Sequence, residues 1–289
     1  MSDAFSELCD RFNSVTLRVT LKLHERARLT AFKGSMLHGW WGHALKQYSE
    51  DLFHIFFTEH QTNQPKPYVI HTCPDHKIHW KAGELFRFQL SLFGDATKVA
   101  SQVIHALYQA AHLGLGEQRT PFSILSIESM TPDGVHPDLI TTSLSQWLTT
   151  KPPISIPDIT VMTQTPLRLK YKGKALEHLT FDLNFWIQKT LSRWLDISKY
   201  WVIDHAPLTR SIMQTKPCLP EHQVESQTQF IAWHRQSMSQ KTKMPVGGLT
   251  GQWRFSGEVA EAWPILKIGE MLGLGSNTTM GFGRFHVLC

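Results

Sequence analysis

The chain has 289 residues, 42% of them hydrophobic, and carries a formal charge of +5 at pH 7. This length can bury the core of one large domain or of two ordinary ones, and we expect two. The basic balance, with a pI near 9.0, suits a polyanionic partner. No run of about 18 apolar residues occurs, and the polar start MSDAFSELCDRFN lacks the apolar core of a signal peptide. The sequence therefore predicts a cytoplasmic protein without a membrane partner.

The cysteines form no recognisable framework. None belongs to a C-x-x-C pair, which argues against a structural zinc module or a set of disulfides, so we expect reduced thiols. The segment HTCPDHKIHW brings zinc-ligand residue types together, but its spacing matches no standard module, and we interpret it as a histidine-rich loop. We expect neither a metal nor another cofactor. The residues concerned are Cys9, Cys73, Cys218, Cys289, His71, His76 and His79.

The first part of the chain follows the element order of a ferredoxin-like fold. VTLRVTLKL alternates as a half-buried strand does, and GSMLHGWWGHALKQYSE has the apolar stripe of a core-facing helix. Two strands, a second helix that ends at glycines, and another strand come next. This order is typical of a ferredoxin-like or RNA-recognition-type unit, with helices on one face of an antiparallel sheet. The elements are expected at residues 15–23, 34–50, 67–72, 85–93, 96–113 and 121–130.

The second part repeats the theme after a break. Residues 131–158 contain five prolines and little periodicity, so we place a linker there, between an N-terminal unit, 1–130, and a C-terminal unit, 159–289. The predicted fold class is α+β, with two tandem ferredoxin-like units and a glycine-rich loop before the last strand, although no sequence repeat is visible. The elements of the second unit are expected at residues 161–174, 179–201, 248–257, 264–271 and 281–288.

Basic residues alternate along RLKYKGK in the first strand of the second unit. If this segment is one strand, its four cations point to one face and its apolar residues to the other. A row of like charges repels itself unless an anion lies over it. A solvated edge strand that deters aggregation is the alternative, and we favour contact with RNA phosphates. The cations are Arg168, Lys170, Lys172 and Lys174.

The helix that starts at Gly34 carries two histidines, His38 and His43, and a lysine, Lys46. At about 100° per residue, His43 and Lys46 lie roughly opposite the apolar stripe, and His38 lies on its flank. A histidine and a lysine one turn apart can transfer a proton and stabilise developing phosphate charge. Surface histidines often have no such role, so the pattern alone leaves both interpretations open.

Near the end, GEMLGLGSNTTMGFGRFHVL places Gly273, Gly275, Gly281 and Gly283 around a polar stretch. Clustered glycines permit positive φ or close approach of another backbone or a phosphate, and an ordinary turn is the alternative. The loop is not a Walker loop, because no Gly-Lys-Ser/Thr closes it and a strand follows it. No nucleophile elbow, dinucleotide fingerprint or paired-carboxylate signature occurs elsewhere either, so dehydrogenases and hydrolases of those classes lack support.

Two segments together resemble a known family. FKGSMLHGWWGHALKQ, and GGLTGQWRFSGEVAEAWPILKIGEMLGLGSNTTMGFGRFHV at the end, are similar to the CRISPR repeat-processing endoribonucleases of the RAMP superfamily, the sixth CRISPR-associated protein family. TPLRLKYKGK also fits the opening of that family's second unit. The sequence departs from the pattern at Ser276, where many relatives carry a lysine, and Arg284 could substitute for it.

The resemblance implies a fold of two ferredoxin-like units and an enzyme that cuts precursor CRISPR RNA once per repeat without metal. It implies a catalytic histidine in or near the first helix, which means His43 or His38, with Lys46 as the nearby cation. The expected partners are CRISPR repeat RNA and other subunits of a CRISPR effector complex. The glycine-rich loop would bind the RNA backbone through Gly273, Gly275, Ser276, Asn277, Thr278, Gly281, Gly283 and Arg284.

Two other functions fit the same sequence. One is a non-catalytic RAMP subunit that binds CRISPR RNA within an interference complex, because such subunits also carry glycine-rich loops on ferredoxin-like units. The other is an unrelated basic RNA-binding protein. The end groups of any RNA product, and a preference for repeat RNA over random RNA, distinguish the three.

Overall fold

A computed structural model describes residues 2–58, 64–72, 76–148, 156–171, 174–176, 181–236 and 243–289. The chain forms two compact units: unit 1 comprises Met1–Thr149 and Asp196–Ile212, and unit 2 comprises Thr150–Leu195 and Met213–Cys289. Among the described residues, no helix is long and apolar enough to cross a membrane.

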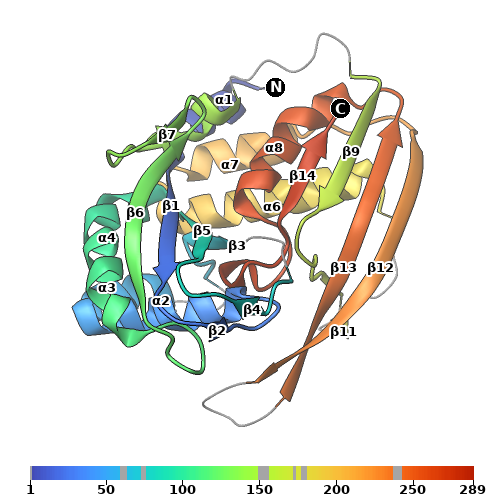
Figure 1. Cartoon of the computed structure of the whole chain (residues 1–289). Coiled ribbons are helices and arrows are strands. Elements are labelled where there is room, and N and C mark those ends of the chain that lie inside the picture. The colour runs from blue at the N-terminus through green and yellow to red at the C-terminus, as the bar shows by residue number, and fades with distance from the viewer. Residues whose placement is uncertain are drawn as a thin grey trace. The chain divides into compact units, whose positions relative to one another are not determined.

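Unit 1 is built on an antiparallel sheet with helices on one side (Figure 1). Its strand order is β3-β5-β1-β6-β7, and β8 pairs with β1. Along the chain, β1, α2, β3, β5, α4 and β6 form a βαββαβ unit whose strands lie in the order fourth, first, third, second, as in ferredoxin-like folds. The elements are α1 (Asp3–Arg11), β1 (Asn13–Leu23), β2 (Ala27–Arg28), α2 (Gly34–Tyr48), α3 (Glu50–Phe57), β3 (Tyr68–Thr72), β4 (His79–Trp80), β5 (Leu85–Phe93), α4 (Ala100–Gln109), β6 (Phe122–Thr131), β7 (Gly134–His136), β8 (Thr142–Ser143) and α5 (Leu144–Leu148).

The alternation of β1 separates the two faces of this sheet. Val15, Leu17 and Val19 belong to the core that α2 and α4 cover. On the opposite face, the guanidinium of Arg18 lies 3.0 Å from the carboxylate of Glu128 on β6. One strand thus supplies apolar side chains to the helices and polar side chains to the other face, as its period of two requires.

Unit 2 has the same topology. Its sheet order is β12-β13-β9-β14, and α6 and α8 connect the strands as the two helices of a second βαββαβ unit. The predicted α+β class with two ferredoxin-like units is therefore confirmed. The elements are β9 (Asp158–Thr163), β10 (Lys170–Tyr171), β11 (Lys174–Ala175), α6 (Leu183–Trp201), β12 (Gln223–Gln236), β13 (Lys243–Ser256), α8 (Trp263–Leu272) and β14 (Phe285–Leu288); α7 (Ala206–Gln214) follows α6.

Large aromatic side chains join helix and sheet in unit 2. The ring of Trp186 on α6 lies 5.2 Å from Trp253 on β13 and 5.3 Å from Phe285 on β14, both edge to face. Gly269 on α8 lies against Thr190 and Phe285, where an added Cβ would be within 2.9 Å of each. The missing side chain lets α8 pack directly on α6 and β14.

Several elements differ from the expectation. The predicted strand over 161–174 is wrong, because β9 ends at Thr163 and Pro166, which has no N–H, interrupts the pairing. Residues 131–158, expected to be a linker, contain β7, β8 and α5; the boundaries at 130 and 159 stay a prediction. The polar β12 and helices α1, α3 and α7 were not predicted, and the last strand is shorter than 281–288.

Candidate functional site

Helix α2 holds His38 in a half-buried aromatic setting. Its Nδ1 lies 3.1 Å from the hydroxyl of Tyr68 on β3, and its ring lies 5.0 Å from that of Phe57 on α3. Tyr68 itself is buried, 1% exposed, so its hydroxyl is a fixed partner. A histidine held at Nδ1 keeps its ring orientation.

His43 and Lys46 lie on the exposed part of the same helix. The Nζ atom of Lys46 lies 5.7 Å from the ring centroid of Phe53 on α3, which places its ammonium group over that aromatic face. By helical geometry, His43 is about 140° around the axis from His38, and Lys46 is roughly between them. The two histidines therefore point in different directions, each with its own neighbour.

The glycine-rich loop, residues 273–284, lies against the chain's own backbone. At Gly283, with φ of +73°, a Cβ would collide with the carbonyl oxygen of Leu274; at Gly275, with φ of +84°, it would collide with that of Arg168. The N–H of Gly283 donates to the carbonyl of Pro166 over 2.9 Å. Close packing inside unit 2 thus accounts for these two glycines without any ligand.

Some polar residues of the loop form hydrogen bonds within unit 2, and others are accessible to a ligand. The N–H and hydroxyl of Ser276 both donate to the carbonyl of Arg168, at 2.8 and 3.1 Å. Buried Thr278 accepts a 2.7 Å hydrogen bond from Arg193. Asn277 takes the left-handed conformation, φ 66°, and is half-buried. Of the residues predicted to bind RNA, Thr278 stabilises the loop, whereas Asn277 stays within reach of a ligand.

Arg284 and the remaining loop glycines lie where the loop joins β14. The N–H of Arg284 donates to the hydroxyl of Thr165 over 2.9 Å, and its carbonyl accepts from Gln164 over 2.8 Å. Gly273 ends α8 with φ of 65°, and Gly281 ends the short turn Thr278–Met280 with φ of 82°. The loop is therefore fixed at both ends to the segment that follows β9.

The prediction of one strand along 168–174 is wrong, because the described residues of this segment include two short strands, β10 and β11, that pair with each other. Lys170 pairs with Ala175, and Tyr171 with Lys174, on two opposing arms. Arg168 instead donates from Nη1 to the carbonyl of Gly247 on β13 over 3.0 Å. For Lys174 only the backbone is described, and Lys172 lies outside the described residues.

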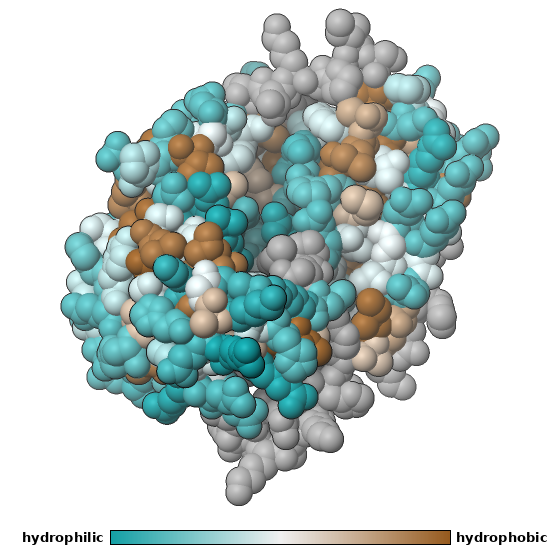
Figure 2. Space-filling model, viewed as in Figure 1, coloured by the Kyte–Doolittle hydropathy of each residue, from teal (hydrophilic) through white to brown (hydrophobic). Residues whose placement is uncertain are grey.

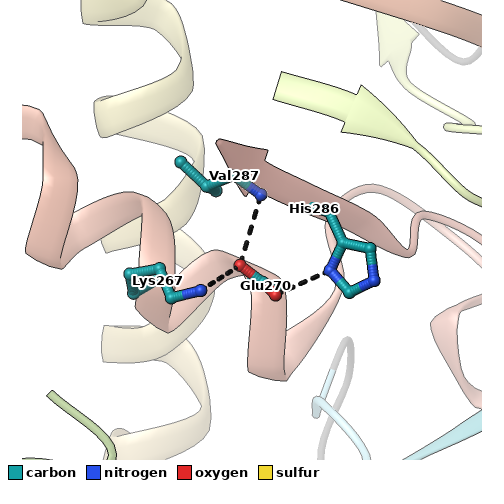
Figure 3. A network of polar contacts seen from close by, with 4 residues as sticks. All are labelled: Lys267, Glu270, His286 and Val287. Carbon is teal, nitrogen blue, oxygen red and sulfur yellow. Dashed lines mark hydrogen bonds and ion pairs between the residues drawn. The ribbon is translucent and has the colours of Figure 1, made fainter. Parts of the chain in front are cut away.

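Sequence reasoning missed a polar network on α8 and β14 (Figure 3). Nδ1 of His286 donates to Glu270 over 2.7 Å, and Lys267 and the N–H of Val287 reach the other carboxylate oxygen at 2.6 and 3.3 Å. Burial raises the pKa of Glu270, but the hydrogen bonds and charges of His286 and Lys267 outweigh it, so this pKa is lowered overall. Glu270 and His286 are 16 residues apart, so no local pattern could reveal the pair.

The histidine-rich segment is spread over separate elements. His71 is buried on β3, and His79 is exposed on β4 opposite Arg28. Cys73 lies outside the described residues. Within the part of the chain that the structure describes, no group of three or more His, Cys, Asp or Glu residues is arranged to hold a metal ion.

Solved structures similar to this chain share its fold at low identity. A partial Cas6-RT-Cas1–Cas2 complex matches with a TM-score of 0.64 and 14% identity, over 97% of this chain and 47% of that chain. A Cas6 product complex gives 0.59 and 17%, over 95% and 99%, and Thermus thermophilus Cas6 gives 0.56 and 14%, over 96% and 99%. The chain thus spans about half the length of the first of these structures.

Family models cover both parts of the sequence. Residues 12–152 match a model described as an N-terminal domain, and residues 161–285 match the model of CRISPR-associated endoribonuclease Cas6. No curated protein matches the sequence. The second match takes in α8, the glycine-rich loop and the start of β14, which carry the C-terminal part of the resemblance, whereas the segment on α2 lies within the first match. Residues 161–285 of the chain are thus similar to the Cas6 family of CRISPR-associated endoribonucleases.

Proposed function

We propose that the chain is an endoribonuclease that binds CRISPR repeat RNA and cuts precursor CRISPR RNA without a metal ion. The observation that carries this proposal is the match of residues 161–285 to the Cas6 endoribonuclease family. The similar structures include a Cas6 product complex and Cas6-RT-Cas1–Cas2 complexes. These favour repeat RNA and other CRISPR subunits as the partners.

In the proposed reaction, the ribose 2′-oxygen attacks the adjacent phosphorus after a base takes the hydroxyl proton. The bond from phosphorus to the 5′-oxygen then breaks, and an acid protonates that oxygen. The products are a 2′,3′-cyclic phosphate and a 5′-hydroxyl. Histidine suits either proton transfer near neutral pH, and a lysine stabilises the extra negative charge of the phosphorane.

Among the two histidines of α2, we favour His38 for proton transfer. Its contact with the buried hydroxyl of Tyr68 fixes the ring, as the orienting partner of a catalytic histidine does. His43 has greater exposure and lies one turn from Lys46, which makes it the second candidate. Since the two histidines lie on different faces of α2, single variants separate their roles.

For RNA binding, we propose that the glycine-rich loop contacts the RNA backbone. Asn277 is half-buried, so a phosphate can approach it, whereas the hydrogen bonds of Ser276 to Arg168 hold the loop beside it. The left-handed backbone of Asn277 and the turn behind it form the kind of small concave surface that binds anions through N–H groups. Because the close packing on residues 166–168 fixes the loop, little conformational entropy would be lost on binding.

The test is incubation of the purified chain with labelled repeat RNA in EDTA, followed by identification of the product ends. A single cut that leaves a 2′,3′-cyclic phosphate and a 5′-hydroxyl is the expected result. Cleavage that stops in EDTA and resumes with added metal would contradict the metal-independent mechanism. Tight binding to repeat RNA without a cut would instead identify a non-catalytic RAMP subunit.

A further inference from the structure

The two units share a short motif at equivalent positions. Leu113–Gly116 and Leu272–Gly275 both read LGLG, and each connects the second helix of its unit to the fourth strand. Gly114 and Gly273 end their helices with nearly the same backbone angles, φ 68° and ψ 168° against φ 65° and ψ 156°. Unit 1 therefore has its own counterpart of the glycine-rich loop.

In both units this motif lies against the segment that follows the first strand. In unit 2, Gly275 contacts the backbone of Arg168; in unit 1, a Cβ at Gly116 would be 3.2 Å from Leu29, which follows β2. Both segments are basic. In unit 2 the guanidinium of Arg168 bonds to the protein itself, whereas the arginines of unit 1 are exposed.

The segment in unit 1 forms a two-stranded ribbon, β2 paired with β4, whose outer face carries cations. Ala27 pairs with Trp80 and both point inward, while Arg28 pairs with His79 and both are exposed. Alternation places Arg26 beside Arg28, and Lys81 beside His79, on the outer face. Figure 2 shows a strongly hydrophilic surface over the position of these strands, at the lower centre of the view.

A pocket of about 610 Å³ opens on this ribbon. Trp80 and Gln118, the latter from the turn of the LGLG loop, both line it. Two more cations lie around Trp80: Nζ of Lys77 is 4.4 Å and Nζ of the buried Lys33 is 5.8 Å from the ring centroid. The residues that line the pocket are Arg26, Ala27, Arg28, His79, Trp80, Lys81, Ala82 and Gln118.

Acidic groups near the pocket do not balance these charges. Glu84 binds Lys77 at 2.8 Å and the N–H of Lys81 at 2.9 Å, and exposed Glu25 and Glu117 do not line the pocket. His79 adds charge only when it is protonated. An excess of cations on one ribbon face is self-repulsive and favours an anionic ligand.

We propose that this pocket, together with the LGLG loop of unit 1, binds phosphodiester groups of an RNA strand, as a contact separate from the glycine-rich loop of unit 2. The proposal rests on the proposed RNA-processing function. Arg26 and Arg28 are about 6.6 Å apart along the strand, and His79 and Lys81 repeat that spacing on the neighbour. A linear polyanion carries successive phosphates and can engage cations along the whole ribbon at once. Gln118 adds a hydrogen-bonding group for a ribose or base edge.

The test compares the wild-type chain with the variant R26Q/R28Q/K81Q in binding to repeat RNA over a range of salt concentrations. The control variant K98Q/R210Q/K216Q removes three exposed cations elsewhere. We expect the pocket variant to bind at least about 10-fold more weakly at low salt. The slope of log affinity against log salt should become less negative by about 2, because each of the three lost contacts to single-stranded RNA contributes roughly 0.7. The control should change far less, and thermal unfolding should show that all three proteins are folded.

The outcomes separate the two proposals. If the wild-type chain does not bind repeat RNA, the proposed function fails; if it binds and the pocket variant matches it in affinity and salt slope, only the pocket proposal fails. Inorganic phosphate, added at an ionic strength matched with chloride, tests a single-phosphate site. The strand-binding proposal would be overturned if phosphate displaced RNA from the wild-type chain more strongly than chloride does, and if this difference were absent from the pocket variant.

Discussion

The loops that follow the LGLG motif differ between the two units in their length and in the contacts that they make. In unit 1, Leu115 and Thr120 exchange backbone hydrogen bonds of 2.9 and 3.0 Å, which closes a tight turn. In unit 2, Leu274 bonds to Gly283 over 3.0 Å, and the residues between form the longer glycine-rich loop. The same motif thus starts two loops of different length, and the comparison teaches that both depend on a closely packed glycine, Gly114 in the shorter and Gly283 in the longer, without any ligand.

The largest expected effect on stability comes from adding a side chain where the glycine-rich loop is closely packed. Gly283→Ala places a Cβ against the carbonyl of Leu274 at a positive φ, and we expect it to lower the free energy of unfolding by about 3 kcal/mol or more. Gly114→Ala, which collides with Arg119 in the shorter turn, should cost a similar amount. Gly39→Ala on α2, where nothing lies within 4 Å, is the control and should stabilise by about 0.5–1 kcal/mol. Equal stability of Gly283→Ala and wild type in urea unfolding would show that the loop is not packed in this way.

The half-buried carboxylate of Glu270 in unit 2 accepts a hydrogen bond from a histidine as well as from a lysine and a backbone N–H. Glu270→Gln removes the charge that His286 and Lys267 share, and we expect a loss of about 2 kcal/mol at pH 7. Because the pKa of Glu270 is lowered in the folded state, its contribution is present above the ordinary value of 4.5 and is lost as pH falls through the folded value. The difference between the variant and the wild type should therefore shrink in acid, and a difference that is constant from pH 7 to pH 3 would contradict this origin.

The smallest expected change in stability distinguishes Arg168 of unit 2 from Arg28 of unit 1. Arg168→Gln loses the hydrogen bond to Gly247 and should cost about 1 kcal/mol. Arg28→Gln, on the exposed ribbon, should stay within about 0.5 kcal/mol of wild type. Chemical denaturation of both variants measures this. If Arg28→Gln were the more destabilised, the ribbon arginines would be structural, and the contrast between the units would disappear.

Much of the fold could be predicted from periodicity. The alternation of β1 and the apolar stripe of α2 are local patterns, and β5 begins and ends where the sequence predicts. Strand β12 was missed because its first half is polar and lacks the alternation of a half-buried strand. Residues 168–174 were misplaced because alternating cations suggest one strand, whereas β10 and β11 are two short strands that pair with each other.

The candidate site could be predicted only in part. The helix that carries His38 and His43 follows from local sequence, but the contact between His38 and Tyr68 joins residues 30 positions apart. The pair of Glu270 and His286, and the ribbon of Arg28 and His79, likewise depend on chain pairing that no local pattern encodes. The two LGLG segments are only four residues long and were not recognised as a repeat from the sequence, because their significance required the equivalent positions in two sheets.

The most direct measurement is single-turnover cleavage of repeat RNA in EDTA by the wild-type chain and by the double variant His38→Ala/His43→Ala, with RNA affinity measured in parallel. We expect the double variant to cleave at least about 10²–10⁴-fold more slowly and to keep its affinity for the RNA. The variants His38→Ala and His43→Ala then show which histidine transfers the proton. Full cleavage by the double variant would contradict proton transfer from α2.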